Sequence, residues 1–125
     1  MEGGTVQTLR PPARTHAPRA HGSILVVDDD EMIRNLFLEL FRPEGIAVRV
    51  AGSAQEAVSL IKQSTPALLL VDVTLPDRDG ISVLEEAQKL DSRIMSVVMT
   101  GAPSVDLAVR AMKAGEVART VLMFD

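Results

Sequence analysis

Short, largely apolar runs recur along the chain, and each is separated from the next by a stretch of mixed apolar and polar residues. Runs of this kind, bounded by polar residues, glycine or proline, are typical of strands buried on both faces of a parallel sheet. We therefore expect five strands, at Ile24–Val27, Ile46–Val50, Leu68–Val71, Ile94–Met99 and Thr120–Phe124.

The stretches between these runs carry apolar residues at helical spacing. The spacing i, i+3, i+4, i+7, or a close variant, recurs in each, which predicts four amphipathic helices. Pro43 and Gly45 are expected to end the first helix, and Gly115 the fourth. Ser53 and Glu56 predict a capping box at the start of the second. The expected inward faces are Ile33, Leu36, Phe37 and Leu40; Ala54, Ala57, Val58 and Ile61; Val83, Leu84, Ala87 and Leu90; and Val105, Ala108, Val109 and Met112.

Strands that alternate with helices over short connections predict βαβ units and therefore the α/β class. We expect a doubly wound parallel sheet of five strands, in the order 2-1-3-4-5, with the succession (βα)4β. In such sheets a ligand site lies beyond the carboxyl ends of the strands, where the direction of winding reverses.

Composition narrows the class of protein. The 125 residues leave room for one domain, and 46% hydrophobic with 24% charged residues is typical of a soluble globular chain. The absence of cysteine excludes disulfides, thiolate zinc sites and thiol nucleophiles. No apolar run approaches the roughly 20 residues that a membrane-spanning helix needs.

Charge divides the chain into two parts. Residues 1–22 contain three arginines, one glutamate and three prolines, without the apolar core of a signal peptide. We expect a disordered leader there, with a basic interaction arm as the alternative, and one domain at 23–125. Because the whole chain carries −4, residues 23–125 carry −6. Such an acidic domain is a poor surface for nucleic acid, so direct binding of nucleic acid is not expected.

Acidic residues gather where the first and third expected strands end. Asp28 and Asp29 follow the first strand, Asp72 follows the third, and Thr100 follows the fourth. If the first and third strands are neighbours, their three carboxylates lie close together, which raises carboxyl pKa values unless a cation neutralises the charge. Mg²⁺ prefers carboxylate, water and phosphate oxygens, so it is the expected cation. A carboxylate beside it is a candidate acceptor of a phosphoryl group.

Each acidic residue also has a simpler interpretation. Asp30 is expected to cap the first helix, and an isolated aspartate at the end of a strand is more often structural than catalytic. The combination of residues at several strand ends favours chemistry. A calcium-binding loop around Asp77 is excluded, because its first ligand position would be Leu75.

Four stretches resemble the receiver domains of response regulators. Residues 24–31, ILVVDDDE, resemble the apolar strand and acidic pair at the start of those domains. Residues 69–80, LLVDVTLPDRDG, resemble their phosphoacceptor loop, with proline four residues after the acceptor aspartate and Asp-Gly at seven and eight. VVMTG at 97–101 and AMKAG at 111–115 resemble their fourth strand, with its switch threonine, and the end of their fourth helix. The resemblance covers about residues 23–115.

The resemblance implies roles for the residues at these positions. Asp72 would accept a phosphoryl group from a sensor histidine kinase or a phosphotransfer protein of a two-component phosphorelay. Asp29 would bind Mg²⁺ directly and Asp28 directly or through water, while Asp72 and the carbonyl of Thr74 would supply the remaining protein ligands. The hydroxyl of Thr100 would turn toward the phosphoryl oxygens.

The family also implies a setting and a loop conformation. Pro76 and Gly80 would shape the phosphoacceptor loop through their backbone restrictions. Receiver domains of this kind imply a bacterial, cytoplasmic protein without membrane contact.

The resemblance ends after Gly115. Receiver domains carry Lys-Pro at the end of the fifth strand, and those positions are Leu122 and Met123 here. The family's aromatic residue three positions before that lysine is Arg119, which an odd offset along the strand directs to the opposite face. Because the family's fifth helix begins where Asp125 stands, we expect this helix to be missing. Either the reading frame is truncated or disrupted, or the chain is a purposeful variant. An apolar sheet face left open would favour a homodimer, helix exchange or instability.

Two functions besides the phosphoacceptor module remain open. Leu122 and Met123 favour a receiver-like interaction module that works without phosphorylation, through the surface of the fourth helix and fifth strand. Asp28-Asp29-Asp30 also fits the Asp-x-Asp motif of haloacid-dehalogenase-type phosphohydrolases. That family needs a longer chain, and Thr or Val where Met32 stands. We therefore expect no enzyme activity beyond assistance with the chain's own phosphorylation and dephosphorylation.

Overall fold

The computed structural model describes residues 23–101, 104–115 and 120–124. The expected leader at 1–22 and Arg119 lie outside these ranges. The described strands are β1 (Ile24–Val27), β2 (Val48–Ala51), β3 (Leu68–Asp72), β4 (Met95–Thr100) and β5 (Thr120–Phe124). The described helices are α1 (Glu31–Phe41), the short 3-10 helix η1 (Arg42–Glu44), α2 (Ala54–Gln63), α3 (Gly80–Leu90) and α4 (Val105–Gly115).

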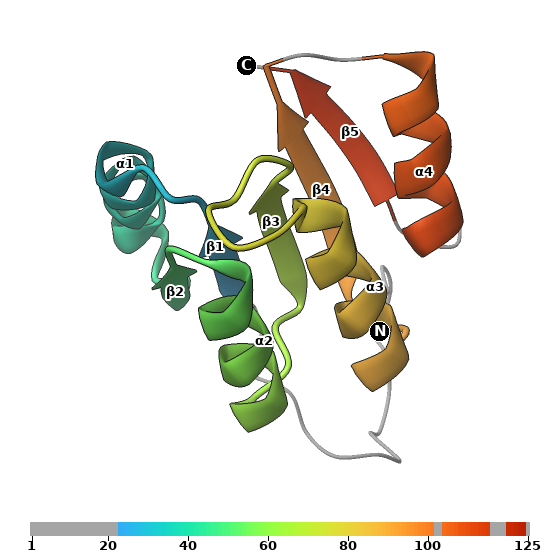
Figure 1. Ribbon diagram of the computed structural model, residues 1–125. Helices are drawn as coiled ribbons and strands as arrows, with labels where there is room; N and C mark the ends of the chain where they lie inside the picture. Colours follow the sequence, from blue (N-terminus) through green and yellow to red (C-terminus); the bar gives the residue numbers. More distant parts are fainter. Residues whose placement is uncertain (1–22, 102–103, 116–119, 125) are drawn as a thin grey trace, which may run out of the picture.

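The described strands form one parallel sheet in the order β2-β1-β3-β4-β5, which confirms the predicted α/β class and strand order (Figure 1). The register joins Val27 to Ala51 on one side and to Val71 on the other. The carboxyl ends of β1 and β3 therefore lie side by side at the upper edge in Figure 1.

Alternate residues of each strand point to opposite faces of the sheet. Leu25 and Val27 join a large cluster with α2, α3 and α4, on what we call the α2 face. Ile24 and Val26 join a smaller cluster with residues of α1, on what we call the α1 face. The sheet is thus covered on both sides, as a doubly wound fold requires.

The helices begin at capping side chains. The Asp30 carboxylate accepts a hydrogen bond from the Met32 N–H at 2.9 Å, so its expected capping role is confirmed. Ser53 Oγ accepts from the Glu56 N–H at 3.2 Å, while the Glu56 carboxylate accepts from the Gly52 N–H at 2.9 Å. The capping box is confirmed, with its glutamate reaching one residue further back than the usual motif.

The ends of α1 follow the predicted signals. Pro43 lies in η1, and Gly45 adopts a left-handed conformation with φ of 70°. Strand β2 begins two residues later than expected, and the Ile46 N–H donates to the Phe41 carbonyl. Gly115 is the last residue of α4, as predicted.

Three of the four expected inward faces are wrong in part. In α4, Val105, Val109 and Met112 are exposed, and the buried residues are Leu107 and Ala111. The small and apolar residues of this helix satisfy helical spacing on both faces, so spacing alone cannot choose between them.

In α1, Leu36 and Leu40 are exposed, whereas Ile33 and Phe37 are half-buried. No residue of α1 is fully buried. The expected faces of α2 and α3 are buried apart from Leu90, which is 41% exposed.

Candidate functional site

Three carboxylates meet at the carboxyl edge of the sheet. Asp28 and Asp29 follow β1, and Asp72 is the last residue of β3. One oxygen atom from each carboxylate lies within 4.8 Å of the other two. Asp28 is 6% exposed, Asp72 is half-buried and Asp29 is exposed, so the cluster has a buried side and an open side. The structure thus brings together the three carboxylates that the strand pattern predicted.

The backbone fixes the position of Asp28. Its N–H donates to the Ala51 carbonyl of β2 at 3.0 Å, and its carbonyl accepts from Arg34 Nη1 at 2.8 Å. Its carboxylate accepts from the Asp30 N–H at 2.9 Å. The turn between β1 and α1 therefore holds this carboxylate against the sheet edge.

Crowding and burial raise the pKa of Asp28. The largest cause is burial, which disfavours the charged form of the carboxyl group. The hydrogen bond from the Asp30 N–H lowers the pKa, whereas the negative charges of Asp72, Asp29 and Asp30 raise it further. A cation in the cluster would remove the repulsion. Oxygen ligands from several carboxylates, with one side open for water, fit a hard divalent cation such as Mg²⁺ or Ca²⁺.

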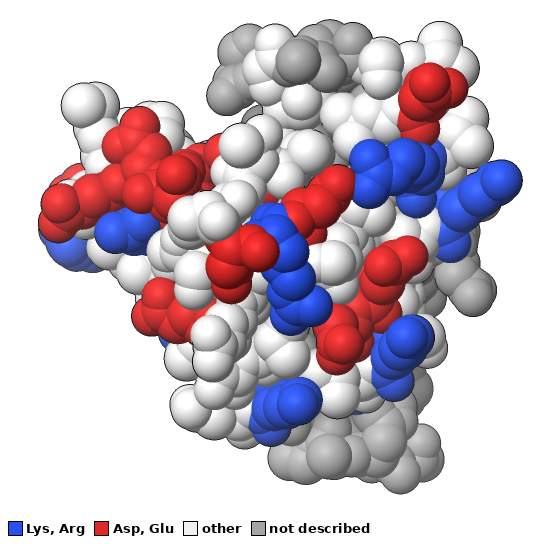
Figure 2. Space-filling model, viewed as in Figure 1, with Lys and Arg blue, Asp and Glu red and all other residues white. Residues whose placement is uncertain are grey.

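Acidic side chains also dominate the surroundings of the cluster. Figure 2 shows them gathered over α1 and the adjoining loops, at the left of the molecule, whereas acidic and basic groups alternate over α3 and α4. This distribution would attract a cation and not an anion to the open side of the site.

The phosphoacceptor candidate is held by the loop that follows it. The Asp72 carboxylate accepts from the Thr74 N–H at 3.0 Å, and the Val73 N–H donates to the Met99 carbonyl of β4 at 3.0 Å. The Thr74 side chain is exposed, and Thr74 forms an isolated bridge with Asp79. Metal binding by the Thr74 carbonyl stays a prediction.

Thr100 ends the neighbouring strand. Because Asp72 pairs with Met99, Thr100 lies one residue further along at the same edge of the sheet. Thr100 is buried, with 6% of its surface exposed. Its expected role toward phosphoryl oxygens stays a prediction.

Gly80 shapes the loop by close approach and not by a positive φ. A Cβ atom at this position would overlap the carbonyl oxygen of Asp72. The Gly80 N–H donates to the Val73 carbonyl at 2.7 Å, which closes the loop onto the end of β3. The first residue of α3 therefore packs directly against the backbone of Asp72.

Two further aspartates anchor this loop, and sequence reasoning assigned them no role. The Asp77 carboxylate accepts from the N–H groups of Ala54 and Gln55, both at 2.9 Å, at the start of α2. Asp79 caps α3 by accepting from the Ile81 N–H at 2.6 Å. An aspartate just before a helix is a recognisable cap signal, so the capping role of Asp79 could have been predicted from the sequence. The contact between Asp77 and α2 has no such local signal.

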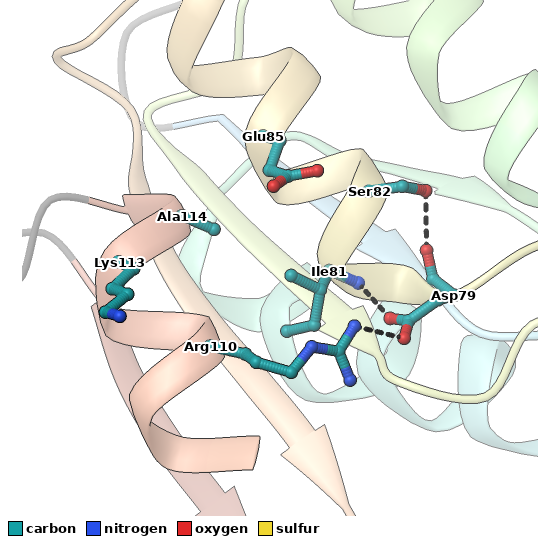
Figure 3. Close-up of a pocket in the computed structure, with 7 residues that line it drawn as sticks. All are labelled: Asp79, Ile81, Ser82, Glu85, Arg110, Lys113 and Ala114. Atoms are coloured by element: carbon teal, nitrogen blue, oxygen red, sulfur yellow. Dashed lines mark hydrogen bonds and ion pairs between the residues drawn. The ribbon is translucent and has the colours of Figure 1, made fainter. Parts of the chain in front are cut away.

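A cation on α4 pairs with the second of these aspartates. Arg110 Nη2 lies 2.7 Å from Asp79 Oδ2, and both side chains line a pocket of about 320 Å³ between α3 and α4 (Figure 3). This pair connects α4 to the start of α3, one residue before Gly80.

The positions of the family's Lys-Pro pair lie on β5. Leu122 is the register partner of Val98, and Met123 that of Met99. Neither residue carries a cation. A lysine contact to a phosphoryl group is therefore not available from these two positions.

None of the helices in the described ranges is long and apolar enough to span a bilayer.

The sequence and the fold both match known proteins. The chain is 30% identical over 102 residues to sporulation initiation phosphotransferase F of Bacillus subtilis (strain 168), covering 82% of each chain. It is 38% identical over 92 residues to transcriptional regulatory protein ZraR of Salmonella typhimurium, covering 74% of this chain but 21% of that protein. The chain thus spans about a fifth of the length of some curated relatives.

Two solved structures share the fold. A CheY-like response regulator receiver domain protein from Methanospirillum hungatei JF-1 matches with a TM-score of 0.76 and 33% identity, covering 83% of this chain and 82% of that one. A response regulator from Burkholderia pseudomallei, with a phosphorylated aspartic acid, a calcium ion and citrate, matches with a TM-score of 0.74 and 30% identity, covering 81% and 58%.

The family model for the response regulator receiver domain matches residues 24–120, which is most of the chain. The strand order and the carboxylates at the ends of β1 and β3 agree with that match. The chain belongs to the family of response regulator receiver domains.

Proposed function

We propose that the chain is the phosphoacceptor module of a two-component phosphorelay, with Asp72 as the acceptor. The observation that carries the proposal is the approach of the Asp28, Asp29 and Asp72 carboxylates to within 4.8 Å at adjacent strand ends. These residues, together with the Thr74 carbonyl, would hold Mg²⁺. When bound, the cation would neutralise charge on the phosphoryl oxygens during transfer.

The proposed transfer uses the Asp72 carboxylate as a nucleophile. A carboxylate oxygen attacks the phosphorus atom of the donor, and an O–P bond forms as the P–N bond of a phosphohistidine breaks. The departing imidazole nitrogen keeps the electron pair. Water later hydrolyses the aspartyl phosphate, which returns inorganic phosphate and the carboxylate.

Neighbouring groups of the chain would orient these steps. The Thr74 N–H donates to Asp72 Oδ1 and so restricts rotation of the nucleophile. The Thr100 hydroxyl would donate to a phosphoryl oxygen. The related response regulator from Burkholderia pseudomallei contains a phosphorylated aspartic acid and a calcium ion, which supports an aspartate acceptor and a divalent cation in this chain.

The proposed partners and setting follow from the same chemistry. The donor is a sensor histidine kinase or a phosphotransfer protein, and a cytoplasmic location would bring the two together. A homodimer is the second partner that we propose, and sedimentation velocity tests it. The proposed organisation is a leader at 1–22 before a receiver domain at 23–125.

A receiver-like interaction module that works without phosphorylation is the second candidate. Leu122 and Met123 favour it, because they place no lysine at the end of β5. A charge-assisted hydrogen bond contributes roughly 1.5–3 kcal/mol, so its loss would weaken a phosphorylation-driven shift about tenfold or more.

Intact mass spectrometry after incubation with acetyl phosphate and Mg²⁺ separates the two candidates. The phosphoacceptor function predicts an adduct of one phosphoryl group, which is absent in Asp72→Asn and in wild type with EDTA. A folded wild-type chain that gains no adduct would contradict the phosphoacceptor function and favour the interaction module.

A further inference from the structure

The loop between β3 and α3, residues 73–79, is fastened to the body of the protein by its side chains. Leu75 is 8% exposed and belongs to the cluster on the α2 face. Asp77 reaches α2, and Asp79 caps α3. The loop therefore follows a path that contacts outside its own backbone determine.

The contact with α2 completes the first turn of that helix. The first four N–H groups of an α-helix lack partners within the helix. Ser53 Oγ provides an acceptor for one of them, Glu56, while the Ala57 N–H makes the first regular helical bond, to the Ser53 carbonyl. Asp77 provides the acceptors for two more, Ala54 and Gln55, although it lies more than twenty residues away along the chain.

The Asp77 carboxylate is held in one orientation, because each of its oxygens accepts a separate backbone hydrogen bond. These bonds, led by that from Ala54, lower the pKa of Asp77 and keep it charged. A carboxylate at a helix N-terminus is also favoured by the helix dipole.

Helix α2 is a firm anchor for this contact. Ala54, Ala57 and Ile61 are fully buried under the sheet. At the other end of the helix, Arg49 of β2 donates to the carbonyls of Leu60 and Ser64, at 2.9 and 2.6 Å. A loop fixed to α2 is therefore fixed to the sheet.

The chain between this anchor and the acceptor is short. Three residues after Asp72 comes buried Leu75, and two residues later comes Asp77. Between Asp72 and Leu75 lies Thr74, whose N–H donates to the Asp72 carboxylate and whose carbonyl is the expected metal ligand. A shift at Asp77 would therefore move the backbone that carries both groups.

We propose that Asp77 is a positioning residue for phosphoryl transfer to Asp72, which it serves by fastening the acceptor loop to the N-terminus of α2. The inference rests on the proposed phosphoacceptor function. Asp77 would act through the loop backbone and would not contact the phosphoryl group. Its loss would slow the transfer because a displacement of the reacting groups by about 1 Å can slow a reaction up to a hundredfold.

Ser53 offers a matched control. It caps the same turn of the same helix, but it belongs to α2's own N-terminus and not to the acceptor loop. Ser53→Ala and Asp77→Ala should both weaken α2. Only Asp77→Ala should release the loop.

The test compares initial rates of Asp72 phosphorylation by acetyl phosphate in wild type, Asp77→Ala, Asp77→Asn and Ser53→Ala, across a series of Mg²⁺ concentrations. We expect Asp77→Ala to be slower by about tenfold and Ser53→Ala to stay within about twofold of wild type. Asp77→Asn should recover part of the rate, because its amide oxygen accepts one hydrogen bond whereas its NH₂ group accepts none. Circular dichroism establishes that each variant is folded.

Each result bears on the inference in a defined way. Equal rates for Asp77→Ala and Ser53→Ala would overturn it while leaving the phosphoacceptor function in place. If Asp77→Ala does not fold, the comparison passes to Asp77→Asn, and a rate equal to wild type would overturn the inference. A wild-type chain without an adduct would overturn the phosphoacceptor function, and this inference with it.

Discussion

The α2 face and the α1 face of the sheet share their strands but differ in how deeply their helices are buried. Seventeen buried residues of the described ranges form the cluster on the α2 face, drawn from the strands, from α2, α3 and α4, and from the loops at Leu75 and Ile94. Four buried residues form the cluster on the α1 face, and all four belong to strands. Helix α1 contributes no fully buried residue and leaves Met32, Leu36 and Leu40 more than half exposed.

The candidate site lies where these unequal halves meet. Asp28 and Asp29 come at the start of the connection to α1, whereas the acceptor loop is anchored on the α2 face through Leu75, Asp77 and Asp79. Asp72, the proposed acceptor, is thus supported by the well-packed α2 face, whereas Asp28 and Asp29 adjoin the α1 face, where fewer residues are buried. We expect substitutions on the α2 face to affect both stability and acceptor chemistry, and those on α1 to affect neither strongly.

The largest contrast should come from one substitution made on each face. Leu84 of α3 is fully buried, and Leu40 of α1 is 55% exposed. Leu84→Ala should lower the free energy of unfolding by about 2–5 kcal/mol, because it removes buried methyl groups and leaves a cavity. Leu40→Ala should change it by about 0.5 kcal/mol or less. Urea unfolding measures both, and equal losses would show that α1 is buried in solution.

A pair of glycines sharpens the contrast at the loops. Gly80→Ala places a methyl group against the Asp72 carbonyl, so we expect a loss of about 1–3 kcal/mol together with most of the phosphorylation rate. Gly45→Ala meets nothing within 4 Å and strains only its own left-handed backbone, at about 1–2 kcal/mol. Gly45→Ala should still be phosphorylated. Normal labelling of a folded Gly80→Ala chain would contradict the close approach.

The carboxylate cluster predicts that a third substitution, Asp28→Asn, stabilises the protein, whereas the substitutions above destabilise it. The pKa of Asp28 is raised above its ordinary value of 3.8 by burial and by like charge. In the pH window above 3.8 the folded state therefore binds more protons at this residue than the unfolded state. Its contribution to stability is present in acid and is lost as the pH rises through the raised pKa.

Without Mg²⁺, Asp28→Asn should therefore be more stable than wild type at neutral pH, by about 1 kcal/mol or roughly 4–8 °C in melting temperature. Saturating Mg²⁺ should stabilise wild type and not the variant, because ligands stabilise the state that binds them. Glu39→Gln, on the exposed side of α1, is the control for loss of one negative charge. A melting temperature that falls in Asp28→Asn without Mg²⁺ would contradict the charge crowding.

The difference between the faces also explains what the sequence could predict. The strand order and the meeting of Asp28, Asp29 and Asp72 were predictable, because parallel strands present their carboxyl ends at one edge. The buried face of α2 was predictable because its other face is polar. Helix α4 misled the prediction, since Val105 and Val109 have helical spacing but are exposed while Leu107 is buried.

The anchors of the acceptor loop were out of reach for a different reason. Local rules find caps next to the helix that they cap, as Asp30 and Ser53 show. Asp77 caps a helix that ended well before it in the sequence, and Arg110 of α4 pairs with Asp79, the residue that caps α3. Such contacts depend on how α2, α3 and α4 pack over one face, which spacing along the chain does not specify.

The smallest expected effect concerns two exposed ion pairs, one on each side of the sheet. Arg42 pairs with Glu39 at 2.9 Å within α1 and η1, whereas Arg110 of α4 pairs with Asp79 at 2.7 Å across a large sequence distance. Exposed ion pairs contribute little to stability, so Arg42→Gln and Arg110→Gln should each change the melting temperature by roughly 2 °C or less.

Hydrogen exchange should nevertheless tell the two apart. Arg42→Gln breaks a contact between residues that the same helical turn already holds together, so exchange elsewhere should not change. Arg110→Gln breaks a contact that joins α4 to the cap of α3, beside the Gly80 that touches the acceptor backbone. Amides of α4 should then exchange faster, by about threefold, as a local opening becomes easier. Unchanged exchange in α4 would mean that packing of Leu107 and Ala111 alone holds this helix, and that the pair carries no connection between α4 and the acceptor loop.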